Sequence, residues 1–428
     1  MSHAPEPLHD PAGRHDESAL HDEGAPETWT APPDLAAAVL CRARRAAPLL
    51  REAAPATEAA RGLPAETVEL LRKVGVWRAA MPREWGGPDL TSVQQVELLE
   101  LLAQGDPSAA WCAMIGMDSG IYAGYLEPGA AKEIYHGIDL VTAGALFPTG
   151  TAEKSDGGYR ISGRWRFASG IGHSDVLMAS CIVLENGADV PDPVTGEPRQ
   201  WRVFAAAPGQ FTVHDTWHTT GLRGSGSHDY SAEDLFVPDR HVFTMSRPRT
   251  DRVLLRTPDA VQRKMPGVPL GLARAAIDYA VSLADGRRDR ETGTPWTSDL
   301  RVHEVIGRCE MELHAARASV YASLNDQWEG LEAGRSELRA ERVTTALARY
   351  HAFQSARRIV QALYDLLGGT AVYTAASPFD RWLRDANTMC QHAVAQDAVL
   401  QMAGVVRLGG EPPNPVNPAL AVSLPAAS

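Results

Sequence analysis

The pattern of apolar and polar positions changes twice along the chain. From about residue 34 to residue 137, alanine-rich stretches alternate with short breaks rich in glycine and proline, a pattern that predicts helices. Between residues 140 and 243 the apolar residues instead form short runs with β-branched and aromatic members, separated by Gly, Asp and Pro clusters. No helical stretch connects these runs, so they predict strands in a largely antiparallel sheet.

Long helices are predicted again after Pro266. Apolar residues step by three or four from Val302 to Leu331, which places one stripe along a single long helix. A second long helix is predicted from about residue 336 to residue 367, where Gly368-Gly369 offers a C-terminal cap. A third begins near Ser377. Long antiparallel helices of this kind form a bundle.

These changes of pattern set the predicted boundaries. We expect a helical domain over residues 33–139, a central antiparallel β domain over 140–245 and a four-helix bundle over 246–408, an α+β chain. The first 32 residues carry seven acidic side chains, one arginine and many prolines, so they cannot bury enough apolar area to fold and are predicted to be disordered. Five prolines in residues 409–428 predict a second, proline-rich tail.

Composition narrows the class of protein. The 428 residues carry 41 Lys+Arg against 53 Asp+Glu, a net charge of −12, which argues against binding to nucleic acid or to an anionic membrane. No apolar run is long enough to span a bilayer, and the amino terminus lacks a secretion-signal pattern. We therefore expect a cytoplasmic enzyme. Its five scattered cysteines form no C-x-x-C pair, and we expect reduced thiols and no metal site.

Several common catalytic motifs are missing from the chain. There is no G-x-x-x-x-G-K-[ST] phosphate loop, no G-x-G-x-x-G after a strand and no G-x-S-x-G elbow. Phosphate-loop nucleotide binding, a Rossmann dinucleotide site and serine-hydrolase chemistry are therefore not expected.

Five segments together point to a known family. The chain contains PREWGG, GRWRFASG, GLRGSGSHD, DLFVP and FDRWLRDA, which begin at Pro82, Gly163, Gly221, Asp234 and Phe379. In this order, within a helix–sheet–helix chain, they resemble the acyl-CoA dehydrogenase fold over about residues 34–409. The resemblance implies a flavin between the β domain and the bundle, held partly by a neighbouring subunit, and a homotetramer.

The chain departs from the dehydrogenases at the catalytic base. Counting on from Arg384-Asp385-Ala386, the glutamate that removes the α-proton in that family would fall at Ala393, and the tyrosine before it at His392. No carboxylate stands there, so desaturation of an acyl thioester is poorly supported.

His392 in that register, together with residues 146–175, is similar to the flavin-dependent monooxygenases of the same fold. These include oxygenase components of hydroxyphenylacetate and phenol hydroxylases and hydroxylases of aromatic polyketides and indoles in secondary metabolism. The resemblance implies reduced FMN, with FAD as the alternative, delivered by a separate flavin reductase. Reaction with O₂ would give a C4a-hydroperoxyflavin that hydroxylates a small aromatic molecule.

Two residues are the candidate catalytic groups. The resemblance places the hydroxyl of Ser169, in the FASG turn, beside the flavin N5 atom; a plain turn serine is the structural alternative. His392 is expected on the last helix, where an imidazole with a pKa near 6.5 could accept a phenol proton or donate to peroxide. Its alternative is a helix histidine with purely structural hydrogen bonds.

Aromatic residues are the candidates for packing against the flavin and the substrate. Trp217 precedes the GLRGSGS segment and could cover one face of the flavin ring, with Phe167 and Trp111 as further candidates. His173 matches a histidine of the related hydroxylases, and with Trp111 it could border the substrate. Core packing and loop hydrogen bonds explain the same residues structurally.

The phosphate of the flavin requires donors. Arg287, Arg288 and Arg290 follow the first bundle helix, where the family usually places a phosphate-binding arginine. We take Arg288 as the candidate, but the sequence does not choose among the three. A solvated charged run is the alternative. Gly368 and Gly369 could approach a neighbouring subunit's flavin or could only cap their helix.

Three other functions stay open. They are an acyl-CoA dehydrogenase or oxidase with bound FAD, an amino-sugar N-oxygenase on the same fold, and a non-catalytic flavin- or partner-binding scaffold.

Overall fold

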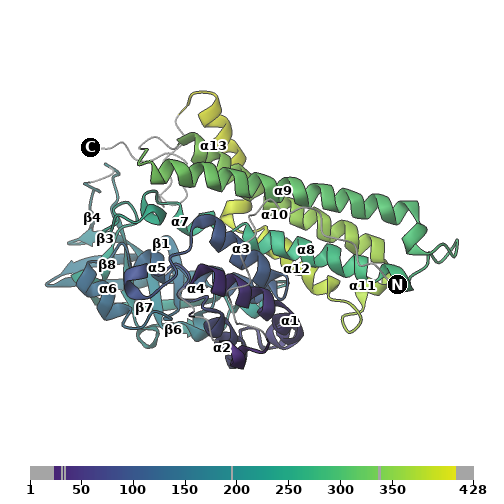
Figure 1. The fold of residues 1–428 in the computed structure, drawn as a ribbon. Helices are drawn as coiled ribbons and strands as arrows, with labels where there is room; N and C mark the ends of the chain where they lie inside the picture. The colour runs from purple at the N-terminus through teal and green to yellow at the C-terminus, as the bar shows by residue number, and fades with distance from the viewer. Residues whose placement is uncertain (1–23, 30–31, 33–34, 194–195, 336–338, 411–428) are drawn as a thin grey trace.

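The computed structural model describes most of the chain (Figure 1). The described residues are 24–29, 32, 35–193, 196–335 and 339–410. The predicted disordered segment over residues 1–32 and the proline-rich tail over 409–428 lie almost entirely outside them.

The first part of the chain is helical, as predicted. Its helices are α1 (Ala36–Ala60), α2 (Ala65–Val74), α3 (Ser92–Ala103), α4 (Pro107–Gly116), α5 (Ser119–Tyr122) and α6 (Pro128–Ile134). Asp106 begins α4 by accepting a hydrogen bond from the backbone N–H of Ser108 at 3.0 Å. The apolar segment that begins at Ser108 is buried as expected. Helix α4 covers only its first part, because the helix ends at Gly116.

The central part forms one eight-stranded sheet. Its strands are β1 (Thr142–Ser155), β2 (Gly158–Ala168), β3 (Val176–Glu185), β4 (Ala188–Asp189), β5 (Trp201–Ala206), β6 (Thr212–His214), β7 (His228–Pro238) and β8 (Val242–Phe243). They lie in the order β6-β7-β2-β1-β3-β5-β8, with β4 beside β3.

One strand pair corrects the prediction of an antiparallel sheet. β1 and β3 run parallel, and their register shifts between Ala145 and Gly150. The other pairs are antiparallel, so the sheet is mixed. β2 pairs with one edge of β1 and runs antiparallel to it. The chain then crosses to the other edge of β1, where β3 runs parallel to β1 and not antiparallel as predicted.

The last part is the predicted helical bundle. It consists of α7 (Ala260–Arg263), α8 (Gly267–Ser282), α9 (Leu300–Glu332), α10 (Arg339–Leu367), α11 (Gly369–Val372), α12 (Phe379–Met389) and α13 (Ala398–Arg407). α9 and α10 run side by side along its length (Figure 1), and most of the predicted apolar stripe of α9 is buried. Within the described residues, no helix is both long and apolar enough to cross a membrane.

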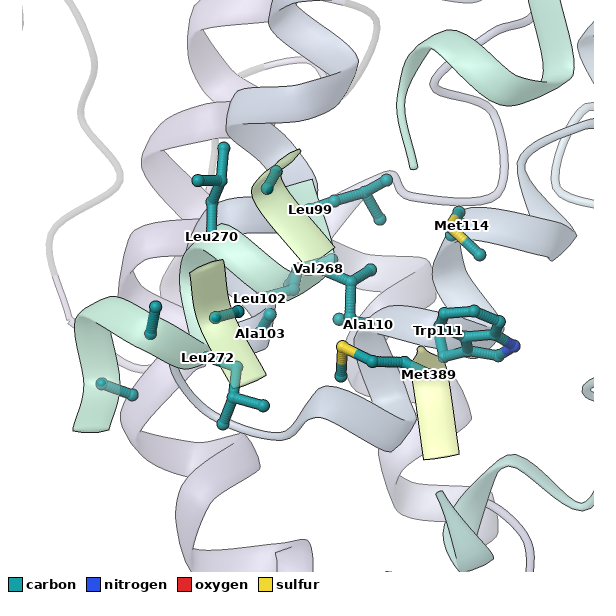
Figure 2. Close-up of a cluster of buried hydrophobic side chains, with 14 of the residues drawn as sticks. Leu99, Leu102, Ala103, Ala110, Trp111, Met114, Val268, Leu270, Leu272 and Met389 are labelled. Carbon is teal, nitrogen blue, oxygen red and sulfur yellow. The ribbon is translucent and has the colours of Figure 1, made fainter. Parts of the chain in front are cut away.

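The N-terminal helices and the bundle share one core. On α8, a Cβ atom added at Gly271 would lie 2.2 Å from the backbone oxygen of Glu100 on α3, so only glycine permits this close approach of the two helices. Figure 2 shows the side chains around the crossing, with Trp111 of α4 at one edge of the cluster beside Met389 of α12. The shared core therefore fixes α4 relative to α12.

A buried ion pair joins the start of the bundle to the N-terminal helices. The Lys264 ammonium group donates to the Asp118 carboxylate and, at 3.1 Å, to the backbone oxygen of Val261. Lys264 is fully buried and Asp118 is 3% exposed. Burial raises the pKa of Asp118 to about 6, although the neighbouring ammonium group opposes the shift.

We predict that Lys264→Met destabilises the protein by about 3–5 kcal/mol, because it leaves the Asp118 carboxyl buried without its partner. The double variant Lys264→Met/Asp118→Leu should recover most of this loss. Chemical denaturation measures both effects. Lys154→Met, which breaks the exposed pair with Glu185, is the control and should cost less than about 1 kcal/mol. Equal losses from Lys264→Met and the control would contradict the prediction.

Candidate active site

Ser169 lies at the centre of a chain of buried hydrogen bonds. It follows the end of β2, is 6% exposed, and accepts a hydrogen bond from the indole Nε1–H of Trp111 at 3.1 Å. Its Oγ is 2.8 Å from the Oγ of Ser227, which is in turn 2.7 Å from the Oγ of Ser225. Sequence reasoning identified Ser169 and Trp111 but missed both serines of the GLRGSGS segment. Their alternating positions in that motif were the available signal.

The structure also brings His392 to Trp111. The two rings meet edge to face with their centroids 5.7 Å apart. The sequence predicted that His392 lies on the helix that begins near Ser377. This is wrong, because that helix, α12, ends at Met389. His392 begins the short 3-10 helix η11 (Ala393–Ala395), and its Nδ1 accepts a hydrogen bond from the backbone N–H of Val394 at 3.3 Å.

The protonation state of His392 follows from this environment. Burial, and then the charge of Arg349, lower the pKa of His392 to about 4. The expected value near 6.5 is therefore wrong for this structure, and the imidazole is neutral at pH 7. Because Nδ1 accepts from the backbone, the proton is assigned to Nε2, so His392 presents a hydrogen-bond donor.

Two aromatic side chains stand beside this cluster. Phe167 is 65% exposed and has a left-handed backbone with φ of 65°. Its ring meets the half-buried ring of Trp217 edge to face, with centroids 6.2 Å apart. The Trp217 indole donates to the backbone oxygen of Leu222 at 2.9 Å. Phe167 lies two residues before Ser169, so the two rings together form an apolar surface close to the Ser169 turn.

A buried aspartate holds the loop that carries Trp217 and the two serines. Asp385 of α12 accepts a hydrogen bond from the backbone N–H of Leu222 at 2.6 Å. One residue earlier, a Cβ atom on Gly221 would lie 2.1 Å from the backbone oxygen of Arg384, so glycine is required there. The second carboxylate oxygen of Asp385 has no hydrogen-bond partner among the described residues. Burial and then the nearby charge of Asp106 raise the pKa of Asp385 to about 7.

His173 lies close to the Ser169 turn. Its backbone N–H donates to the oxygen of Gly170 at 3.1 Å, and its ring is 5.7 Å from that of Trp77. Within the described part of the chain its buried Nε2 atom finds no partner. Burial is the main cause that lowers the pKa of His173 to about 4.

The arginines predicted to bind the flavin phosphate lie away from the Ser169 cluster. Arg287 donates to the hydroxyl of Thr370, next to Gly368 and Gly369, and stacks on Trp296. One of its terminal nitrogens is buried without a partner among the described residues. Arg288 instead donates to the backbone oxygen of Gly293 at 3.0 Å and is exposed. Figure 1 shows α11 at the end of the bundle away from the strands, so these residues and the Ser169 cluster form two separate groups.

Comparisons with known proteins cover most of the chain. The profile of the family "Acyl-CoA dehydrogenase, C-terminal domain" matches residues 266–397. An indole-3-acetate monooxygenase from Acinetobacter baumannii is 33% identical over 353 residues, which are 81% of this chain and 88% of the relative. The oxygenase component of an FADH2-dependent resorcinol hydroxylase from Rhizobium sp. is 29% identical over 86% of this chain and 93% of its own.

A solved structure is similar throughout. XiaF from Streptomyces sp., in complex with FADH2 and glycerol, superposes with a TM-score of 0.81 at 23% identity. The match covers 89% of this chain and 97% of that one. At this identity the likeness establishes the fold alone.

We predict that the stability gained from Asp385→Asn depends on pH. Asn keeps an oxygen for the Leu222 N–H without a charge. The raised pKa of Asp385 means that its protonated form contributes stability below about pH 4, and this contribution is lost as pH rises through about 7. Relative to wild type, the variant should therefore be more stable at pH 8 than at pH 4.5, by more than about 1 kcal/mol. Denaturant midpoints at both pH values measure this. Asp285→Asn, at an exposed position, is the control, and a pH-independent difference for Asp385→Asn would disprove the prediction.

Proposed function

Because the chain belongs to the family of flavin-dependent monooxygenases built on the acyl-CoA dehydrogenase fold, we propose that it is the oxygenase component of a two-component system. It takes reduced flavin from a separate reductase and uses O₂ to hydroxylate a small aromatic molecule. The observation that carries this proposal is the meeting of Trp111, Ser169 and His392 at one place in the fold.

The residues around Ser169 fit a flavin ring. A flat, largely apolar ring system needs an aromatic wall and a few fixed polar groups. Phe167 offers an exposed aromatic ring, Trp217 packs against its edge, and Ser169 supplies a hydroxyl whose position is fixed by Trp111. We assign Phe167, Trp217 and Ser169 to the flavin ring, and Trp111 and His173 to the boundary with the substrate.

A phosphate fits the second group of residues. Arg287 has a buried terminal nitrogen without a partner in the described part of the chain, and a Cβ atom on Gly368 or Gly369 would meet open space. The geometry favours Arg287 over Arg288 as the phosphate ligand. Since this group lies at the far end of the bundle from the sheet (Figure 1), we propose that a neighbouring subunit of a homotetramer brings it to the flavin.

The bound reduced flavin would supply two electrons to O₂, from which one oxygen atom goes to the substrate and the other to water. The chain's own residues control protons and water. When Ser227 donates to Ser169, the Ser169 oxygen accepts two hydrogen bonds and its own proton is free to be donated. His392, neutral and protonated on Nε2, donates toward the reacting oxygen without adding charge.

A dehydrogenase acting on acyl thioesters is not favoured. Such an enzyme needs a carboxylate base, and Ala393 occupies the position where the related dehydrogenases carry theirs. The sugar N-oxygenase alternative has weaker support, because the similarity to KijD3, solved with FMN and a dTDP-linked amino sugar, is 22% identity and concerns the fold.

We predict that His392→Ala lowers product formation by about 100-fold, because a positioned donor in proton transfer contributes roughly this much. Binding of reduced FMN should change less than about threefold, since the proposed ring contacts remain. Product formed per O₂ consumed, with chemically reduced FMN and a panel of phenols and indoles, measures the effect. His314→Ala, exposed on α9, is the control. An unchanged yield from His392→Ala would remove this residue from the proposed site.

We predict that Arg287→Ala weakens the binding of reduced FMN by about 10- to 100-fold, the cost of a charge-assisted hydrogen bond to phosphate. Arg288→Ala should weaken it less than about threefold, because its guanidinium is exposed. Anaerobic titration measures both affinities, and repeating it with reduced FAD tests which flavin is preferred. A larger loss from Arg288→Ala would reverse the assignment.

A further inference from the structure

Three buried arginines of the bundle gather around one buried carboxylate. Arg263, Arg342 and Arg349 are 1%, 2% and 5% exposed, and the carboxylate that faces them is Asp259, itself 5% exposed. Asp259 directly precedes α7 and Arg263 is its last residue, whereas Arg342 and Arg349 belong to α10 and are two turns apart. Asp259 therefore lies near the guanidinium groups of Arg263 and Arg342, and its charge also reaches that of Arg349.

Asp259 is already engaged by other groups. Its oxygens accept hydrogen bonds from the hydroxyl of Thr257 at 2.6 Å and from the amide of Gln327 at 2.9 Å. The Nε atoms of Arg263 and Arg342 lie 3.5 and 3.7 Å from the same carboxylate. The third guanidinium, that of Arg349, is left outside these contacts.

Arg349 is the arginine of this group that makes no direct contact with the Asp259 carboxylate. Its Nε atom is buried and has no hydrogen-bond partner among the described residues. Burial lowers the pKa of Arg349 to about 10, so the group is still charged at neutral pH. A buried charge without a partner is costly, and an interior that retains one is typical of a site whose ligand supplies the opposite charge.

The position of Arg349 connects it to the candidate active site. One turn further along α10, the backbone oxygen of Phe353 accepts from the Cys390 thiol at 3.3 Å, and the Gln354 amide donates to the backbone oxygen of Ala395 at 2.9 Å. These contacts fasten α10 to the segment that carries His392. The charge of Arg349 reaches the His392 imidazole, where it disfavours protonation.

We propose that the aromatic substrate carries a carboxylate and that it is bound by the buried guanidinium of Arg349, one turn before the part of α10 that contacts the segment carrying His392. This inference rests on the proposed function and adds the class of substrate. A guanidinium and a carboxylate pair through two parallel hydrogen bonds, so the interaction would both neutralise the buried charge and orient the aromatic ring toward His392. The flavin phosphate is a less suitable partner, because its proposed ligand, Arg287, lies at the other end of the bundle.

The test compares one acid with its neutral analogue. Indole-3-acetate and indole-3-acetamide differ in charge but hardly in size, and both are offered to the full-length enzyme with chemically reduced flavin and O₂. Arg349→Met removes the charge, Arg349→Lys keeps it, and Arg308→Met, at an exposed position of α9, is the control. Arg349→Met should raise KM for the acid by about 30- to 100-fold, the range for a lost charge-assisted hydrogen bond. KM for the amide should change less than about threefold.

Thermal unfolding provides a readout that does not need turnover. Arg349→Met should leave the melting temperature of the free enzyme unchanged or raise it, because the lost charge had no partner. Indole-3-acetate should raise the melting temperature of wild type and of Arg349→Lys but not of Arg349→Met. If Arg349→Met does not fold, Arg349 has a structural role and the proposal is overturned.

The outcomes separate this inference from the proposed function. If neither compound is hydroxylated but indole-3-acetate still stabilises wild type and not Arg349→Met, hydroxylation of these aromatics fails while the carboxylate site stands. If Arg349→Met raises KM for the acid and for the amide equally, the carboxylate site is disproved. It is also disproved, whatever the turnover, if the acid raises the melting temperatures of wild type and Arg349→Met alike.

Discussion

The candidate site depends on the backbone contact between the loop 217–227 and α12. Gly221 packs against the carbonyl of Arg384 with no room for a side chain, and Asp385 accepts the N–H of Leu222. This contact joins the sheet to the bundle and sets the positions of Trp217 and Ser227. Through Ser227 it also fixes Ser169 at the end of β2. Displacing one short loop would therefore disturb the aromatic wall and the hydroxyl chain together.

Burial decides the protonation of the groups around this loop. The same loss of water lowers the pKa of His392 and raises that of Asp385, because in each case the charged form is disfavoured. At neutral pH His392 is therefore uncharged and Asp385 is partly protonated. Such groups can hold a reactive oxygen species by hydrogen bonding without offering free protons or water.

The sequence predicted local features better than long-range contacts. Apolar spacing located the stripe of α9, and the FASG and GLRGSGS motifs marked two of the segments that meet at Ser169. Neither pattern could show that β3 crosses to the far side of β1, because strand direction depends on distant pairing. His392 was placed on a helix because periodicity does not reveal the end of α12 at Met389. The burial of Arg349 was equally hidden, since it results from contacts that form only when distant segments are brought together.

The net negative charge of the chain bears on how the buried Arg349 could recognise an anionic substrate. A net charge of −12 would repel an anionic substrate at long range, but salt screens this repulsion beyond about 8 Å under physiological conditions. At the end of the approach the local environment dominates, because the interaction of two charges strengthens as water is excluded. A guanidinium that is only 5% exposed, such as that of Arg349, can therefore select an anion on a molecule whose surface does not attract one. Recognition at this site would then depend on fit and desolvation after encounter, which favours specificity over the rate of association.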